Sequence, residues 1–291
     1  MIPVARGMVK TVLGAIGYLI AEPAEPTLTP LLCFHGSPRC SDEYLEVLPL
    51  FAAGGRKVVA LDVPGYGISE NPVKSCSIDE VADAFLEVAD ALGIEKFVAV
   101  GCLMGNFVSV SLASRYPDRV AACICANLYY YPPEAVKSKL HDAAGKTDGS
   151  EIADSWELKD DGSHLLELHN RRKWLDPDLN VRVVQGELTY LVNRRARYSK
   201  GISIQDLSEF DFEPAAVKSK CPTLCVKGEE ALAFFDMIGF NGTKQFEAGC
   251  KLFENCEVES LSGSKSTINM INQEPEQFAA VCSSFLEKNR L

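Results

Sequence analysis

The chain has 291 residues and a mass of 31.8 kDa, which suggests one large domain or one domain that carries a sizeable insertion. Hydrophobic residues make up 47% and charged residues 24% of the sequence, a balance that excludes wholesale disorder, collagen and coiled coil. The 40 acidic residues outnumber the 29 basic ones and give a formal net charge of −11. A strongly acidic surface is a poor match for nucleic acid or an anionic membrane, so we expect neither as a partner.

The sequence holds eleven cysteines, an odd number that does not suggest a set of disulfide bonds. They stand at positions 33, 40, 76, 102, 123, 125, 221, 225, 250, 256 and 282, mostly within apolar runs. We therefore expect small buried thiols and a reducing compartment, the cytoplasm or another intracellular one. A C-x-C at 123–125 and a C-x3-C at 221–225 are weak metal signals. We expect no metal site and no cofactor.

The N-terminal segment, residues 1–22, contains an apolar run from Thr11 to Ala21 that follows basic residues. The pattern admits two interpretations, a signal peptide or strand material. The run is too short to span a bilayer, and the unpaired cysteines argue against export, so we predict strands. No other segment approaches the length of a transmembrane helix.

Downstream of this segment, short and nearly continuously apolar runs predict strands that are buried on both faces. The runs are Leu31–Phe34, Val58–Val63, Phe97–Val100, Val120–Ala126, Thr223–Val226 and Val258–Leu261. Ser77 and Glu80 form a capping box that opens a helix ending near Gly93, and a last helix begins near Pro275. This alternation predicts an α/β fold, with a mostly parallel central sheet and helices on both faces.

The alternation breaks between residues 131 and 218, in a stretch that is more polar and has a helical pattern. We predict one core in two parts, residues 1–130 and 219–291. The helical insertion of residues 131–218 is expected to lie on the sheet between them.

Four short motifs follow the predicted strands, at the place where the loops of an open α/β sheet bind ligands. They are HGSP at 35–38, DVPGYGIS at 62–69, GCLMG at 101–105 and YPDRV at 116–120. One such motif has little weight, but the four in this order and spacing together resemble the α/β-hydrolase family. The resemblance covers the core on both sides of the insertion, and the insertion stands where that family carries its cap. It implies the α/β-hydrolase fold with a helical cap.

The resemblance also implies a catalytic triad, in which a serine in a G-x-S-x-G elbow attacks, a late histidine removes its proton and an acid orients the histidine. This sequence departs from that pattern at all three positions. Leu103 occupies the place of the nucleophile, Ala231 that of the acid, and Ile268 lies in the segment that should carry the histidine. No histidine follows His169, so the C-terminal part holds no such base.

Loss of the nucleophile or the base costs a triad enzyme roughly a factor of 10⁶ in kcat, to take the case of subtilisin. We therefore predict a triad-lacking protein that binds a small, mainly apolar molecule without hydrolysing it. The alternative is an enzyme that uses the same cavity for a cyclisation, isomerisation or lyase reaction. An atypical hydrolase fits the sequence less well, and a protein partner in place of the small molecule is also open.

The expected pocket is formed by the loop after the first core strand and by the elbow. Its residues are His35, Gly36, Ser37, Cys102, Leu103 and Met104. We expect His35 to fix its loop, and the N–H groups of Ser37 and Met104 are candidates for a pair of oxyanion-hole donors. Cys102 is the candidate for a substitute nucleophile, against the interpretation as a buried, unactivated thiol. His164, on the expected cap, is the first candidate for an acid or base, with a solvated helix face as the alternative.

Overall fold

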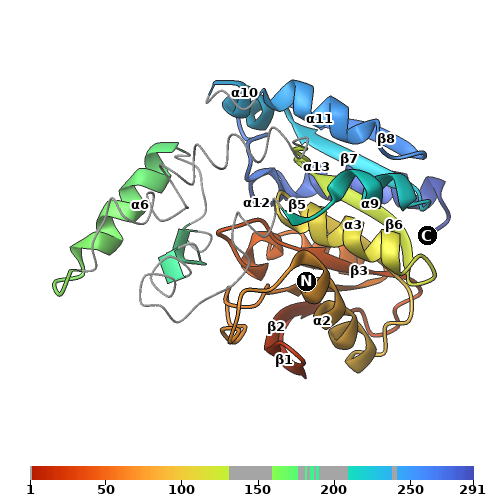
Figure 1. Cartoon of the computed structure of the whole chain (residues 1–291), viewed down its shortest axis with the longest axis horizontal. Coiled ribbons are helices and arrows are strands. Elements are labelled where there is room, and N and C mark those ends of the chain that lie inside the picture. Colours follow the sequence, from red (N-terminus) through yellow and green to blue (C-terminus); the bar gives the residue numbers. More distant parts are fainter. Residues whose placement is uncertain are drawn as a thin grey trace.

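The computed structural model of the chain describes residues 2–130, 159–175, 181, 184–186, 188–189, 209–237 and 241–291. In this part of the chain, eight strands form one sheet in the order β1-β2-β4-β3-β5-β6-β7-β8 (Figure 1). β2 pairs antiparallel with β1 and β4, and every further pair is parallel. The predicted α/β fold with a mostly parallel sheet is confirmed.

The strands lie close to the runs that the sequence predicts. Their bounds are β1 Val4–Thr11, β2 Gly14–Ala21, β3 Leu28–Phe34, β4 Arg56–Leu61, β5 Phe97–Cys102, β6 Val120–Ala126, β7 Thr223–Gly228 and β8 Cys256–Leu261. The N-terminal segment forms the β1–β2 hairpin, which confirms the prediction of strands. β8 is not buried on both faces as expected, because it is the edge strand, and residues 258–260 are exposed.

The helices divide into two layers on the faces of the sheet. Their bounds are α1 Leu48–Ala53, α2 Ile78–Ala91, α3 Gly105–Arg115, α9 Phe212–Lys218, α10 Glu229–Met237, α11 Gly242–Cys250, α12 Met270–Gln273 and α13 Pro275–Lys288, after a short 3-10 turn η1 at Ser41–Tyr44. α2, α3, α9 and α11 bury side chains against one face, and α1, α12 and α13 against the other. Successive side chains of β3 point to opposite faces of the sheet, so Leu32 packs in the first layer and Leu31 in the second.

The predicted cap of α2 is formed in full. The N–H of Glu80 donates to Ser77 Oγ at 3.1 Å, and the N–H of Ser77 donates to Glu80 Oε2 at 2.9 Å. Gly93 follows the helix with a left-handed φ of 69°. Both ends of this helix were therefore visible in the sequence.

Most of the predicted insertion, residues 131–218, lies outside the described residues. Of its described parts, α6 (Ser163–Leu175) stands apart from the sheet in Figure 1. α9 packs on α3 instead, with the rings of Phe212 and Phe107 5.1 Å apart. The bounds of the insertion stay a prediction. No helix within the described ranges is long and apolar enough to cross a membrane.

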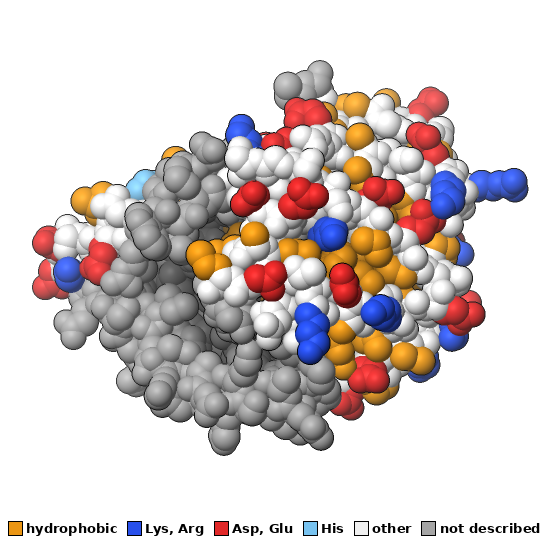
Figure 2. All heavy atoms as spheres, turned by 90° about the horizontal axis from the view of Figure 1, so that it is seen from above, with side chains coloured by type: hydrophobic (Ala, Val, Ile, Leu, Met, Phe, Trp, Pro, Cys, Tyr) orange, Lys and Arg blue, Asp and Glu red, His pale blue; other side chains and the backbone are white. Residues whose placement is uncertain are grey.

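The charged side chains do not gather by sign on the face seen in Figure 2. Acidic and basic groups alternate there, with hydrophobic atoms between them. Among the described residues of the whole molecule, charged groups also form ion pairs near the surface, such as Arg119 with Asp90 at 2.6 Å. The net negative charge is therefore not concentrated in one patch on this face.

Candidate functional site at the carboxyl edge of the sheet

The turn between β5 and α3 has the shape of a nucleophile elbow, and Leu103 stands at its apex. The backbone of Leu103 is left-handed, with a φ of 49°. For a residue other than glycine, such a conformation costs on the order of 1–3 kcal/mol. The N–H of Leu103 donates to the carbonyl of Ala126 at 3.2 Å, and its carbonyl accepts from the N–H of Asn106 at 3.1 Å. These bonds hold the strained turn against the end of β6.

Close backbone contacts explain the glycines of the elbow. A Cβ on Gly105 would lie 1.9 Å from the carbonyl oxygen of Phe34, and one on Gly101 would lie 2.5 Å from the carbonyl carbon of Gly105. A Cβ on Gly36 would lie 3.2 Å from Cβ and Cδ1 of Leu103. The leucine side chain therefore lies against the loop after β3, where it is 8% exposed.

The structure brings the loops of the other two expected triad positions together. Ala231 is fully buried at the start of α10, and its N–H donates to the carbonyl of Ser266 at 3.1 Å. Two residues further on, the carbonyl of Ile268 accepts a hydrogen bond from Arg39 Nη1 at 3.0 Å. The side chains at the three positions are thus hydrocarbons, which cannot attack, accept a proton or orient an imidazole.

Asn127 joins three loops at this edge, a role that was not predicted from the sequence. Its Oδ1 accepts the N–H of Gly228 at 2.9 Å, and its Nδ2 donates to the carbonyl of Thr267 at 3.3 Å. Its own backbone is left-handed, with a φ of 47°. The available signal was a single amide at the end of an otherwise apolar strand.

His35 is tied to the backbone through both ring nitrogens. The N–H of Val63 donates to Nε2 at 3.0 Å, so the proton sits on Nδ1, which donates to the carbonyl of Gly36 at 2.9 Å. The ring is fully buried, and this burial lowers the pKa of His35, which keeps the ring neutral. The arrangement matches the expected loop-fixing role and leaves neither nitrogen available as a base.

Asp62 and Ser69 fix the loop after β4. The carboxylate of Asp62 accepts the N–H of Ser41 at 2.7 Å and that of Ile68 at 2.9 Å. Ser69 Oγ donates to the carbonyl of Asp62 at 2.7 Å and accepts the N–H of Gly17 at 2.8 Å. Burial raises the pKa of Asp62, although these N–H donors favour the charged form. The polar residues of this motif therefore serve the fold.

A buried ion pair between Arg39 and Glu43 lies behind the loop after β3. Both residues are almost completely buried, at 3% and 2% exposure. Arg39 Nη1 contacts Glu43 Oε1, and Glu43 Oε2 accepts the N–H of Gly36 at 2.8 Å. This pair was not predicted from the sequence, although its i,i+4 spacing directly after the HGSP motif was a usable signal. The pair connects the loop after β3 to Ile268.

The thiol of Cys102 is not an activated nucleophile. Cys102 is fully buried, and this burial raises the pKa of its thiol well above the ordinary value. The negative charge of Glu43 acts in the same direction. The thiol is therefore neutral, whereas nucleophilic attack requires the thiolate.

The two expected oxyanion donors keep open backbone N–H groups. Neither the N–H of Ser37 nor that of Met104 forms a hydrogen bond with another described residue. The side chain of Ser37 is engaged elsewhere, since its Oγ lies 3.0 Å from the hydroxyl of Tyr66. Their role as a pair of oxyanion-hole donors stays a prediction.

Aromatic rings surround this edge of the sheet. Tyr129, in the loop after β6, packs against Phe107 of α3 with ring centres 6.2 Å apart. It also packs against Phe235 of α10 with ring centres 5.7 Å apart. Burial raises the pKa of Tyr129 to about 12, so its hydroxyl stays protonated. These rings give one part of the surroundings of the elbow an apolar surface.

His164 has a local partner on the insertion. Its Nδ1 accepts the N–H of Lys159 at 3.0 Å, and the residue is 8% exposed. Figure 1 shows α6, which carries His164, apart from the turn between β5 and α3. Its role as an acid or base stays a prediction.

The expected pocket between Leu103, Ser37 and the insertion stays a prediction, because most of residues 131–218 lie outside the described residues. A pocket of about 320 Å³ lies elsewhere, between α2, α3 and α9. Its lining includes Asp79, Arg115 and Lys218 and none of the elbow residues. It is a separate, charged surface depression.

Comparison with known proteins decides the family. The model of the alpha/beta hydrolase fold family matches residues 29–228. The chain belongs to the α/β-hydrolase fold family. Among curated proteins it is similar to haloalkane dehalogenase 2 from Mycobacterium tuberculosis, with 31% identity over 116 residues, and to bifunctional epoxide hydrolase 2 from Mus musculus, with 28% identity over 127 residues. Each match covers 40% of this chain, and the matches span 40% and 23% of the two relatives.

Solved structures of this fold match over almost the whole length of the chain. A thermophilic esterase from Thermogutta terrifontis superposes with a TM-score of 0.72 and 18% identity, covering 99% of this chain and 100% of the esterase. The enol-lactonase from Burkholderia xenovorans superposes with a TM-score of 0.67 and 18% identity, covering 97% and 100%. At such identities the likeness establishes the fold, while the reaction depends on the residues at the site.

Proposed function

We propose that this hydrolase-fold protein lacks hydrolase chemistry and binds a small, mainly apolar molecule between its core and the insertion of residues 131–218. The observation that carries the proposal is Leu103 at the apex of the elbow, where an attacking oxygen would stand. A hydrocarbon side chain cannot attack a carbonyl carbon, whatever surrounds it. Ala231 and Ile268 extend the loss to the acid and the base.

The surroundings of the elbow support an apolar ligand. The side chain of Leu103 and the rings of Tyr129, Phe107 and Phe235 offer hydrocarbon surface at this edge of the sheet. Burial of apolar surface contributes roughly 25 cal/mol per Å², so such a site favours a ligand with few charges. All eleven cysteines are free thiols, which supports a reducing intracellular location.

Activity-based labelling tests the absence of hydrolysis. We expect no labelling by a fluorophosphonate probe, and turnover of p-nitrophenyl esters no faster in the wild type than in Leu103→Ala. The two proteins should behave alike because the substitution removes no reactive atom. A label on a pocket residue, abolished when that residue is substituted, would show a working nucleophile and overturn the proposal.

A thermal-shift screen of uncharged small molecules tests the binding. A ligand of this site should raise the melting temperature of the wild type, because it binds the folded state alone. Leu103→Arg should abolish the shift, since it places a charge in the apolar site. Val12→Arg, a matched change at a position that is 77% exposed, should leave it intact. Circular dichroism checks that both variants are folded, and equal shifts in both would place the ligand elsewhere.

A second function, non-hydrolytic catalysis, is favoured by the open N–H groups of Ser37 and Met104. Two such donors can stabilise an oxyanion or enolate without any nucleophile. His164 is then our candidate for the acid or base. Mass spectrometry of products separates the cases, since isomerisation conserves the substrate's mass, decarboxylation removes CO₂ and hydrolysis adds water. Catalysis requires that a product forms with the wild type and not with Leu103→Arg.

A further inference from the structure

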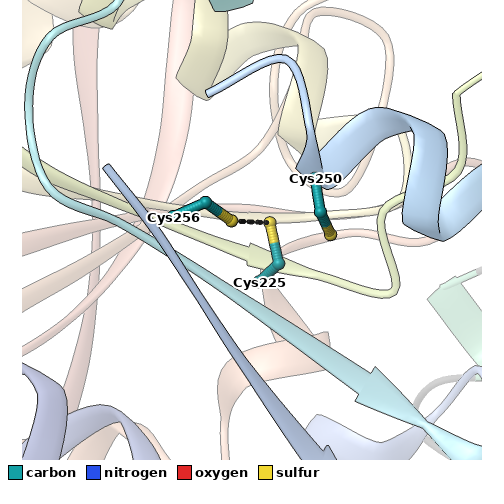
Figure 3. Close-up of side chains that lie close together, drawn as sticks. All are labelled: Cys225, Cys250 and Cys256. Carbon is teal, nitrogen blue, oxygen red and sulfur yellow. Dashed lines mark hydrogen bonds between the residues drawn. The ribbon is translucent and has the colours of Figure 1, made fainter. Parts of the chain in front are cut away.

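Three cysteines from three different elements meet between β7, β8 and α11. Cys225 lies in β7, Cys256 begins β8, and Cys250 ends α11. Figure 3 shows the sulfur atoms of Cys256 and Cys225 facing each other, 3.6 Å apart, with the side chain of Cys250 beside them. All three sulfurs lie within 4.8 Å of each other. The spacing of the cysteines in the sequence did not predict this cluster. Cys225 lies 25 positions before Cys250, and the pairing of β7 with β8 brings it close to Cys256.

The distances suit a metal ion bound by thiolates. The centre of an equilateral triangle lies at its side divided by √3 from each corner. For sides of 3.6–4.8 Å, the limits set by these sulfurs, that distance is about 2.1–2.8 Å. A Zn–S bond measures about 2.3 Å and falls inside this range. An ion in the middle of the cluster could therefore contact all three sulfurs with only small side-chain adjustments.

We propose that Cys225, Cys250 and Cys256 form a binding site for a single thiophilic metal ion, with Zn²⁺ as the best-suited ion. Binding would release the three thiol protons to solvent and create three metal–thiolate bonds. Thiolates prefer zinc and copper(I) to calcium or magnesium, which take oxygen ligands. This inference does not depend on the proposed function.

A fourth thiol lies nearby on the neighbouring strand, outside the group of three whose sulfurs lie within 4.8 Å of one another. Cys125 of β6 is the register partner of Cys225, so the two side chains point to the same face of the sheet. Both belong to the apolar layer that also contains Cys250. Closed sites with four sulfur ligands are the structural type of zinc site, and an open position is what a catalytic zinc needs.

The position of the cluster also indicates a structural role. Cys256 is the first residue of β8, whereas the elbow follows the last residue of β5, at the carboxyl edge. The metal would tie α11 and the edge strand β8 to β7. Residues 251–255, which connect α11 to β8, would then have a metal ligand on either side, Cys250 and Cys256.

Metal binding by the whole protein tests the inference. Protein purified with chelator and reductant is titrated with Zn²⁺ against a chromophoric chelator, and with Co²⁺ for its thiolate absorption bands. We expect one equivalent to bind and the melting temperature to rise with Zn²⁺. Cys256→Ser and Cys225→Ser should each lose this equivalent and the temperature rise. Cys282→Ser, the same change at a fully buried cysteine on the other face of the sheet, should keep both.

Three results would overturn the inference. The first is no stoichiometric binding by the wild type, and the second is binding that survives in both ligand variants. The third is a disulfide between two of these three cysteines in oxidant-free buffer, located by mass spectrometry of proteolytic peptides. Cys256 is half-buried, so Cys256→Ser keeps the test valid if Cys225→Ser fails to fold.

Discussion

At the scale of single residues, the polar groups around the elbow hold the backbone in place. His35, Asp62 and Glu43 are all buried, and each binds a backbone N–H of a neighbouring loop. A buried polar group without a partner costs free energy, so these bonds fix the positions of the loops. This explains why the HGSP and DVPGYGIS segments are present in a chain whose elbow carries leucine.

The buried pair of Arg39 and Glu43 gives the first prediction. Glu43→Gln removes the negative charge that faces the buried guanidinium of Arg39. We expect the free energy of unfolding to fall by about 3–5 kcal/mol in urea titrations. Lys288→Gln breaks the exposed ion pair with Glu257 and should have a much smaller effect. Similar losses in both variants would contradict a special contribution from the buried pair.

His35 gives the second prediction, a pH dependence of stability. Because Nε2 accepts the N–H of Val63, protonation must break that bond, and burial also lowers the pKa of His35. Unfolded histidine titrates near pH 6.5. The stability that His35 contributes is therefore complete above about pH 6.5 and is lost as the pH falls toward the lower, folded pKa.

Denaturant titrations between pH 7 and pH 5 measure this loss. The free energy of unfolding should decline more steeply in the wild type than in His35→Gln, by up to about 1.4 kcal/mol per pH unit. Asp62, whose pKa burial raises, acts with the opposite sign. Parallel curves would show that the ring is not held neutral in the folded protein.

At the scale of elements, local sequence patterns predicted the positions of helices and strands well. Contacts between distant segments could not be predicted from such patterns. The capping box of α2 and the apolar run of β6 are continuous in the sequence, so their positions followed from it. The exposure of β8 depends on the order of strands in the sheet, which the sequence alone did not give. The bond from Arg39 to Ile268 joins residues 229 positions apart, and no periodicity reports such a contact.

The elbow gives the third prediction, which separates steric contact from backbone conformation. Gly105→Ala should cost more than about 4 kcal/mol or prevent folding, because its Cβ would overlap the carbonyl oxygen of Phe34 at 1.9 Å. Gly93→Ala should cost about 1–2 kcal/mol, since its φ is left-handed but nothing lies within 4 Å of the added carbon. Thermal and urea unfolding compare the two variants. Equal losses would mean that the elbow relaxes around the new side chain.

At the scale of the whole molecule, the set of motifs was enough to predict the fold, and the two core segments at 1–130 and 219–291 contribute to one sheet. Three expected triad positions reached the same edge of that sheet because the carboxyl ends of parallel strands meet there. The thiol cluster was not predictable, since Cys225 and Cys250 come together through the packing of α11 on β7. The sequence showed which cysteines lie within apolar runs, but not which of them are close together in space.

The distribution of thiols gives the last prediction. Nine of the eleven cysteines are buried, and Cys221 and Cys256 are partly exposed. With a chelator present, about two thiols of the native protein should react quickly with Ellman's reagent, and the others only as fast as the protein opens. The rapid phase should be lost in the double variant Cys221→Ser with Cys256→Ser, and guanidinium should release all remaining thiols at once. A rapid phase of many thiols in the native wild type would mean that the apolar layers on the two faces of the sheet are open to solvent.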